Sequence, residues 1–334
     1  MRLDRDQAEA LLARLRGCPV AVLGDLMLDE YLFGEVNRIS PEAPVPIVRV
    51  RREKAVLGGG ANVAANLKAL GAEPLLVGTL QQDPAGERLL GLLARLGIRA
   101  DNLVVDPARP TIIKTRVIGH QQQMLRIDRE EARPAEGKAL DALRNALAQV
   151  LPAAKALVVS DYAKGVVCPA VMDVVREQCA FHGLPWIVDP KPAQKELYRG
   201  ASLMTPNTKE TAELTGLPAG SDAEVAVAGR KLEADLGLQG LLVTRSEKGM
   251  ALFAPDAEHR EPWLIPTEAR EVFDVSGAGD TVIAAFAASV GSGGDWRDAA
   301  MLANAAAGVV VAKIGTATAT PQEILDHYHD QEAV

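Results

Sequence analysis

Short apolar runs that end in a polar residue alternate with amphipathic segments along most of the chain. The apolar runs lie at 20–24, 156–160, 186–188, 203–206 and 241–244. Segments with helical periodicity lie between them, at 84–96, 136–151, 169–182 and 223–236. Continuous apolar strands that alternate with helices predict parallel βαβ units, with a sheet covered on both faces. Ligands bind such sheets beyond the carboxyl ends of the strands.

Two segments break this pattern. Residues 30–52 and 111–128 alternate between apolar and polar side chains, which predicts extended and half-exposed strands. A small sheet inserted among βαβ units would form a lid over the crevice, or a dimer surface. A length of 334 residues suggests about two domains. Because no linker rich in Ser, Gly or Pro interrupts the chain, we expect one domain over 1–334 with an inserted lid.

The composition excludes several classes of partner. The formal net charge is −8 and aromatic residues make up 4% of the chain, without a basic run, which disfavours nucleic acid and an anionic membrane patch. The three cysteines, Cys18, Cys168 and Cys179, form no CxxC pair, which indicates reduced thiols. The first 16 residues lack the apolar core of a signal peptide, and no segment is long enough to span a membrane. We therefore expect a cytoplasmic protein.

The sharpest motif is at 274–281, Asp-Val-Ser-Gly-Ala-Gly-Asp-Thr, followed by a helix of small residues. Gly277, Ala278 and Gly279 would leave backbone amides free at the positive end of that helix, which suits an anion hole for a phosphoryl group. Asp280 would stand at the mouth of this hole, where a carboxylate makes sense as the base that accepts a proton from an attacking hydroxyl. The alternative is a glycine-rich helix cap.

Two other phosphate-binding motifs are excluded. The chain contains no G-x-x-x-x-G-K-[ST], so a P-loop is absent from the sequence. Residues 58–63 read Gly-Gly-Gly-Ala-Asn-Val, which fits a dinucleotide fingerprint poorly because the last position is not glycine. These glycines instead open a helix that begins near Ala61. Asn62 would then lie near a ligand at the helix start, or simply cap the helix.

A magnesium site is suggested at Asn207 and Glu210. Both follow a strand and lie three residues apart, so they would share one face of a helix. Oxygen ligands of this kind can hold the water shell of Mg²⁺ beside phosphate groups. The alternative is a capping box, in which the Glu210 side chain caps Asn207.

Other charged side chains could bind a sugar phosphate. Asp25 and Asp29 follow the first strand and offer two carboxylates for sugar hydroxyls. Cations that could neutralise a substrate phosphate are Lys114, Arg116, Arg126 and Lys164. The alternative for each cation is a solvated face. Together these patterns indicate phosphoryl transfer without a P-loop.

At this point the sequence resembles the ribokinase family of carbohydrate kinases. The resemblance rests on Gly24-Asp25, the 58–62 segment, Asn207-x-x-Glu210 and, most specifically, the 274–280 motif. It implies a three-layer α/β/α sandwich with a mostly parallel sheet and a small β-sheet lid. It also implies that Asp280 is the base, that Asn207 and Glu210 organise Mg²⁺, and that a further set of residues binds ATP. That set is Asn207, Thr244, Ser246, Gly249, Gly277, Gly279, Asn304 and Gly308.

Longer matches resemble the branch of this family that phosphorylates D-glycero-β-D-manno-heptose 7-phosphate. They are 37–46, 160–165, 189–191, 244–249 and 304–308. They imply transfer from ATP to the anomeric hydroxyl, on the route to ADP-heptose and lipopolysaccharide core. The substrate-binding residues would be Asp25, Asp29, Gly59, Gly60, Asn62, Lys114, Arg116, Arg126, Asp161, Lys164 and Lys191.

The same resemblance carries expectations about other domains, cations and assembly. Members of this branch are often fused to a nucleotidyltransferase domain, which we do not expect here because the sequence ends about a helix after Pro321. Many family members bind K⁺, but Ala319 stands where some supply a hydroxyl. A homodimer formed through the lid is implied. The alternatives are a kinase of this fold for ribose or fructose, and a non-catalytic sugar sensor.

Overall fold

The computed structural model describes residues 3–120, 122–254, 261–269, 271–313 and 315–332. Its main sheet is built from β1 (Pro19–Gly24), β4 (Glu73–Leu80), β5 (Leu103–Val105), β8 (Ala156–Ser160), β9 (Trp186–Asp189), β10 (Leu203–Met204), β11 (Gly240–Thr244), β12 (Met250–Phe253) and β13 (Trp263–Ile265). Across the described residues the strand order is β13-β12-β11-β10-β9-β8-β1-β4-β5. The strands from β11 to β5 run parallel, and β12 and β13 are antiparallel.

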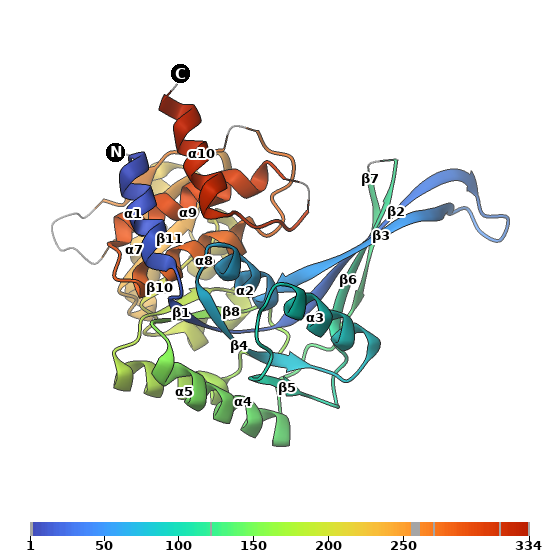
Figure 1. Ribbon diagram of the computed structural model, residues 1–334, viewed down its shortest axis with the longest axis horizontal. Helices are drawn as coiled ribbons and strands as arrows, with labels where there is room; N and C mark the ends of the chain where they lie inside the picture. The colour runs from blue at the N-terminus through green and yellow to red at the C-terminus, as the bar shows by residue number, and fades with distance from the viewer. Residues whose placement is uncertain (1–2, 121, 255–260, 270, 314, 333–334) are drawn as a thin grey trace.

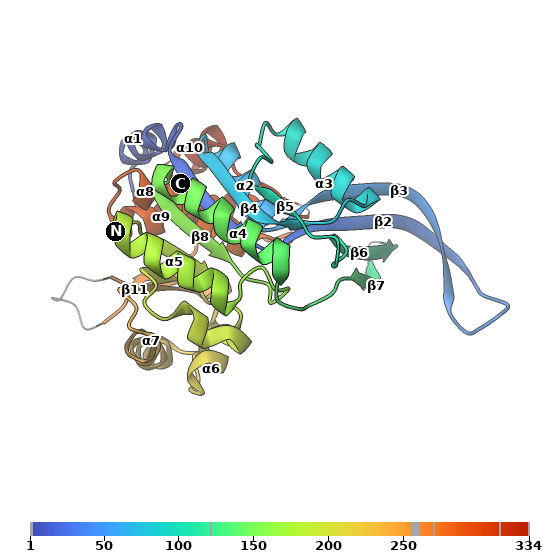
Figure 2. The same cartoon turned by 90° about the horizontal axis from the view of Figure 1, so that it is seen from below.

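Helices cover both faces of this sheet (Figures 1 and 2). One face carries α1 (Arg5–Leu15), α2 (Gly60–Ala69), α3 (Pro84–Arg95), α8 (Ala278–Gly291), α9 (Trp296–Val311) and α10 (Pro321–Glu332). The other carries α4 (Gly137–Val150), α5 (Pro169–His182), α6 (Thr208–Thr215) and α7 (Asp222–Leu236). Short 3₁₀ turns are η1 (Leu151–Ala153), η2 (Pro192–Tyr198) and η3 (Ser246–Lys248). Successive residues of β1 pack into opposite clusters, Val22 into one and Leu23 into the other, as a parallel strand buried on both faces requires.

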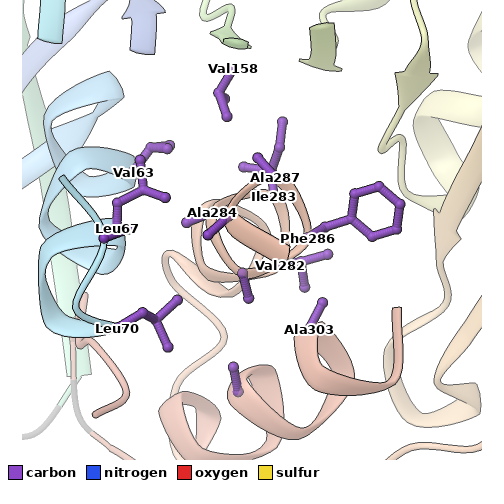
Figure 3. Close-up of a cluster of buried hydrophobic side chains, with 14 of the residues drawn as sticks. Val63, Leu67, Leu70, Val158, Val282, Ile283, Ala284, Phe286, Ala287 and Ala303 are labelled. Carbon is purple, nitrogen blue, oxygen red and sulfur yellow. The ribbon is translucent and has the colours of Figure 1, made fainter. Parts of the chain in front are cut away.

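Helix α8 lies in the middle of one core cluster. Figure 3 shows Val63 and Leu67 of α2, Val158 of β8 and Ala303 of α9 around it. Small side chains along α8, such as Ala284, let these neighbours approach closely, and each fully buried aliphatic side chain contributes roughly 1.5–3 kcal/mol. This packing fixes the N-terminus of α8, which carries the 274–281 motif.

A smaller sheet projects from the main body (Figure 1). It consists of β2 (Leu26–Ile39), β3 (Pro46–Gly59), β6 (Ile112–Gly119) and β7 (Gln122–Arg129). The order among the described residues is β3-β2-β6-β7. The two segments predicted as extended, 30–52 and 111–128, do form strands here. However, β2 begins earlier and β3 ends later than their alternation predicts, because both strands continue into the buried base of the sheet.

The predicted helices and strands of the main body are confirmed with small shifts at their ends. Helix α9 contains the apolar stretch after Ala299, and it is buried in the core. In the described part of the chain, no helix is both long and apolar enough to cross a membrane.

Candidate active site

Polar side chains meet at the carboxyl edge of the main sheet, beneath the smaller sheet. Asp25 follows β1, Asp161 follows β8, Asp189 ends β9 and Asn207 follows β10. The carboxyl ends of parallel strands share one edge, so these residues gather although the sequence separates them. This is the position at which the strand pattern predicts a ligand crevice.

Asp280 lies in the first turn of α8 and is buried, with 4% of its surface exposed. Its Oδ2 accepts a hydrogen bond from Nδ2 of Asn62 at 2.7 Å, and its Oδ1 accepts one from the Tyr162 hydroxyl at 3.1 Å. Burial raises the pKa of Asp280 to about 6, although the two donors oppose this rise. A carboxylate with this pKa is ionised at neutral pH and can take up a proton.

The glycines before Asn62 allow the start of α2 to pack closely against the end of β1. Gly59 caps α2 with a φ of 57°, and a Cβ there would lie 2.4 Å from the Asp25 carbonyl oxygen. The Gly60 amide donates to that same carbonyl at 2.9 Å. Gly59 and Gly60, predicted to bind substrate, therefore seat α2 against the end of β1. This seating brings Asn62 to Asp280.

The glycine motif places Gly277 at the N-cap of α8 with a φ of 80°, where a Cβ would lie 2.8 Å from Nδ2 of Asn62. Gly279 follows it in the first turn. The amide of Ala278 already donates to the Val275 carbonyl at 3.2 Å. The N-terminus of α8 thus supplies the positive end that an anion hole needs. Of the three amides predicted to form this hole, that of Ala278 already has a partner within the chain.

Asp25 and Asp161 have partners that the sequence did not predict. The Asp25 carboxylate accepts backbone amides of Tyr162, Lys164 and Val166 at 3.0, 2.9 and 3.1 Å. Asp161 is fully buried and accepts the Tyr198 hydroxyl at 2.5 Å. Burial raises the pKa of Asp161 to about 6. Both carboxylates hold the loop after β8 in place.

Asp29 and the predicted phosphate-binding cations come together where the smaller sheet meets the loop after β8, whereas the predicted substrate-binding Lys191 lies apart from them. Arg116 lies 2.5 Å from Asp29. Lys114 bridges Asp128 and Glu130, Arg126 contacts Asp128, and Lys164 reaches Glu130 from the loop after β8. We call Lys114, Arg116, Arg126 and Lys164 the cation cluster. These four cations pair with three carboxylates, Asp29, Asp128 and Glu130, and the Asp274 carboxylate also interacts electrostatically with Arg116.

Lys191 lies apart from the cation cluster, near Glu210 and the Tyr162 ring. Its Nζ is 3.4 Å from Oε1 of Glu210 and 5.1 Å from the centroid of the Tyr162 ring. It lowers the pKa values of Asp280 and Asp189, although burial dominates and raises both. Its placement suits charge near the reacting end of a substrate better than a distal phosphate.

A cavity of about 480 Å³ opens on the other side of the α8 N-terminus. Predicted ATP residues on its wall are Asn207, Thr244, Ser246, Gly249, Gly279, Asn304 and Gly308. Apolar side chains such as Val272 and Val275 complete it and remain more than 60% exposed at its mouth. Gly277 stands beside the cavity, at the helix cap. A volume of this size with apolar walls and a few polar groups suits a small-molecule ligand.

Several of these wall residues also shape the backbone. Gly249 has a φ of 76°, and a Cβ there would lie 2.1 Å from the Ile265 carbonyl oxygen. The Asn304 side chain donates to the Pro266 carbonyl at 2.7 Å. Gly308 lies against the backbone of Glu268. They hold the segment after β13 along the cavity wall.

Asn207 and Glu210 form the capping box that was the alternative to a metal site. The Glu210 amide donates to Asn207 Oδ1 at 2.9 Å, and the Asn207 amide donates to Glu210 Oε2 at 3.0 Å. Within the described residues, no group of three or more His, Cys, Asp or Glu side chains could hold a metal ion. A cation here would therefore need ligands beyond such a cluster, such as water and phosphate oxygens.

Comparison with known proteins agrees with this geometry. Residues 20–323 match the model of the pfkB family carbohydrate kinase. The chain belongs to this family. It is 47% identical to the D-beta-D-heptose 7-phosphate kinase of Bordetella bronchiseptica, over 93% of this chain and 96% of that protein. It is 44% identical to the Bifunctional protein HldE of Desulfatibacillum aliphaticivorans, over 94% of this chain but only 64% of that protein.

The fold of this pfkB family member is ribokinase-like. A solved structure of Arabidopsis thaliana ribokinase, complexed with ribose and ATP, superimposes with a TM-score of 0.75 and 23% identity, covering 93% of this chain and 99% of that one. The predicted α/β class, with a mostly parallel sheet and a smaller sheet, is thus confirmed.

Sequence reasoning missed Tyr162, Tyr198 and Asp189 as parts of the site. Tyr162 and Asp189 lie inside motifs at 160–165 and 189–191 that the sequence singled out, but no spacing rule connects either with Asp280. Tyr198 lies in η2, and only the fold brings it to Asp161.

Proposed function

We propose that this chain transfers the γ-phosphoryl group of ATP to the anomeric hydroxyl of D-glycero-β-D-manno-heptose 7-phosphate, giving the 1,7-bisphosphate. The observation that carries this proposal is the 47% identity to a D-beta-D-heptose 7-phosphate kinase across 96% of that protein. The product would serve ADP-heptose and lipopolysaccharide core synthesis. Asp280 between a nucleotide-sized cavity and the cation cluster supports a transfer between two phosphorylated ligands.

In this mechanism Asp280 accepts the proton of the anomeric hydroxyl as that oxygen attacks the γ-phosphorus. Asn62 holds the carboxylate in place through its 2.7 Å hydrogen bond. The N-terminus of α8, with Gly277 and Gly279, stabilises negative charge on the transferring group. Lys191 lies where it would add positive charge at the same end of the crevice.

Magnesium fits the side chains near Asn207 and Glu210. The Glu210 carboxylate lies 3.4 Å from Nζ of Lys191, and the side-chain oxygen of Asn207 stands beside it at the start of α6. Their oxygens suit a hard cation that keeps most of its waters. Asn207 and Glu210 would hold Mg²⁺ through water, and the ion would neutralise charge on the ATP phosphates. Ala319 is buried and brings no hydroxyl, so a bound K⁺ would take its ligands from backbone carbonyl oxygens.

The cation cluster is the proposed site for the distal phosphate. Its members converge from β6, β7 and the loop after β8, and every one is paired with a carboxylate. A phosphate dianion would compete with Glu130 or Asp128 for these cations. The smaller sheet would act as a lid, because it carries part of the cluster and because Asp29 of β2 lies close enough to Asp280 to act on its charge.

We also propose that the protein forms a homodimer through the smaller sheet. Leu125 and Ile127, two residues apart on one face of β7, are 48% and 52% exposed. Apolar side chains gathered on one projecting sheet are typical of an interaction surface. A second copy would cover them.

The test is ADP release from MgATP with a panel of acceptors: heptose 7-phosphate, the unphosphorylated heptose, ribose, fructose and fructose 6-phosphate. We expect the highest kcat/KM with heptose 7-phosphate. Preference for an unphosphorylated pentose or for fructose would indicate another sugar kinase of this family. Calorimetric binding of a sugar without ADP release at any Mg²⁺ concentration would indicate a sensor.

A further inference from the structure

Tyr162 is the second donor on the carboxylate of Asp280. Its hydroxyl donates to Oδ1 at 3.1 Å, whereas Asn62 donates to Oδ2 at 2.7 Å. Because the two donors approach different oxygens from different elements, they fix both the position and the rotation of the carboxylate.

The loop that carries Tyr162 is held firmly. The Tyr162 amide donates to Asp25 at 3.0 Å, and the next amide, of Ala163, donates to Asp161 at 2.7 Å. Ala163 has a φ of 55°, a conformation that alanine rarely adopts without such support. The Lys191 ammonium lies over the Tyr162 ring, 5.1 Å from its centroid. Two buried carboxylates and a cation thus set the direction of one phenol.

Other charged groups influence Asp280 from two strands. Asp29 of β2 and Asp189 of β9 are carboxylates, and Lys191 after β9 is the cation. The neutral side chains of Tyr162 and Asn62 donate hydrogen bonds directly to the Asp280 carboxylate. Burial raises the pKa of Tyr162 well above its ordinary value, and the nearby Asp280 charge raises it further. The phenol therefore stays protonated and acts only as a donor.

We propose that Tyr162 is a positioning residue for the general base: its hydroxyl orients the Asp280 carboxylate toward the acceptor hydroxyl and stabilises the ionised form. The proton of the acceptor hydroxyl passes to Asp280, and Tyr162 keeps its own. That Asp280 acts as a base rests on the proposed function. The hydrogen bond and its effect on ionisation do not depend on which sugar is bound.

The first experiment measures the ionisation of Asp280 directly and without substrate. Protein labelled with ¹³C at the aspartate carboxyl carbon is titrated by NMR, and Asp280→Asn identifies the resonance of Asp280. In Tyr162→Phe we expect the pKa of Asp280 to rise by about one unit, since a donor to the charged form is removed. The acid limb of kcat/KM should move the same way, and kcat at pH 8 should fall about tenfold.

A second variant reverses the effect. Replacing Tyr162 with 3-fluorotyrosine keeps the ring and strengthens the donor, so the pKa of Asp280 should fall. This variant also carries the test if Tyr162→Phe does not fold. Tyr328→Phe is the matched control: it removes the phenol of a buried tyrosine on α10, away from Asp280 and the loop after β8, and should leave the Asp280 titration in place.

The proposal is overturned if Asp280 titrates identically in wild type and Tyr162→Phe, or if Phe and 3-fluorotyrosine shift it in the same direction. The proposed function fails separately, if wild-type protein releases no ADP with any acceptor while the NMR shifts follow the expectation.

Discussion

At the scale of single residues, two opposing effects act on the carboxylate of Asp280. Burial disfavours its charge, while Asn62 and Tyr162 stabilise it by hydrogen bonding. Burial has the larger effect, so the pKa rises from 3.8 to about 6 instead of falling. This balance keeps the carboxylate ionised at neutral pH yet basic enough to accept a proton, as the proposed role requires.

Asp280→Asn should remove the proton-accepting group at this position while preserving the fold. The amide is isosteric and can still accept from Asn62, but it cannot take a proton. We expect kcat to fall by at least about a hundredfold, with the circular dichroism spectrum and ATP binding by calorimetry unchanged. Turnover within about threefold of wild type would contradict the role of Asp280 as base.

The pH profile follows from the raised pKa of Asp280. Below about pH 6 the carboxylate is protonated and cannot act as a base, so kcat/KM should fall as pH decreases through that value. Above it, the profile should be flat until another group titrates. Initial rates from pH 5 to 9, with saturating MgATP, would show this limb. An acid limb near pH 4 would mean that burial does not control the site.

Residue identity alone predicted part of this site. Asp280 and Asn62 were found because each follows a glycine run at a helix start, and that signal is local. The partners of Asp25 could not be predicted, because the amides of Tyr162, Lys164 and Val166 reach it only when β1 and β8 pair. Tyr162 was missed for the same reason.

At the scale of elements, the N-terminus of α8 depends on Gly277. We expect Gly277→Ala to lower kcat and to destabilise the protein by about 1–3 kcal/mol, because alanine is strained at φ 80° and its Cβ would displace Asn62. Gly293→Ala is the matched control: its φ is 82°, but nothing lies within 4 Å of a Cβ there.

Both Gly277→Ala and Gly293→Ala share the backbone strain, so urea unfolding should show a loss of stability in each. Only Gly277→Ala should lose activity. Equal activity in the two variants would mean that the contact between position 277 and Asn62 does not matter.

Elements with strong periodicity were predictable, and the strands at the edges of the main sheet were not. Helices α3, α4, α5 and α7 match their predicted segments within a residue or two. The central strands are continuous apolar runs that end in a polar residue, and even the short β9 and β10 were predicted in this way. Strands β5, β12 and β13 lie at or next to the edges of the sheet and were not singled out by such a pattern.

At the scale of the whole molecule, the cation cluster joins two sheets. Lys164 belongs to the main body and reaches Glu130, which also pairs with Lys114 of the smaller sheet. Lys164→Met should raise the KM for heptose 7-phosphate about tenfold or more, because a charge-assisted contact is worth about 1.5–3 kcal/mol. The KM for ATP should not change.

The control for Lys164 is Lys195→Met, which removes a similarly paired lysine that contacts Asp235 of α7, away from the crevice. Steady-state kinetics with both substrates would separate the two variants. An equal rise in both KM values for Lys164→Met would argue against a distal phosphate at this cluster.

The proposed dimer also belongs to this scale. Replacing Leu125 and Ile127 together with serine should shift the protein from dimer to monomer in sedimentation velocity, since both side chains are about half exposed on β7. Phe181→Ser on α5 is the control: Phe181 is 80% exposed but lies outside the smaller sheet, so its loss should not change the sedimentation coefficient.

The sequence by itself determined the alternation of strands and helices, the helix starts that follow glycine runs, and the position of Asp280 at one of these starts. These features depend on residues close together in the chain. Only the tertiary structure decided which side chains share a contact. Asp25 and Asp161 hold a loop, Lys191 lies apart from the other predicted cations, and Tyr162 contacts Asp280. These contacts join residues from separate strands and helices, and sheet pairing sets their distances.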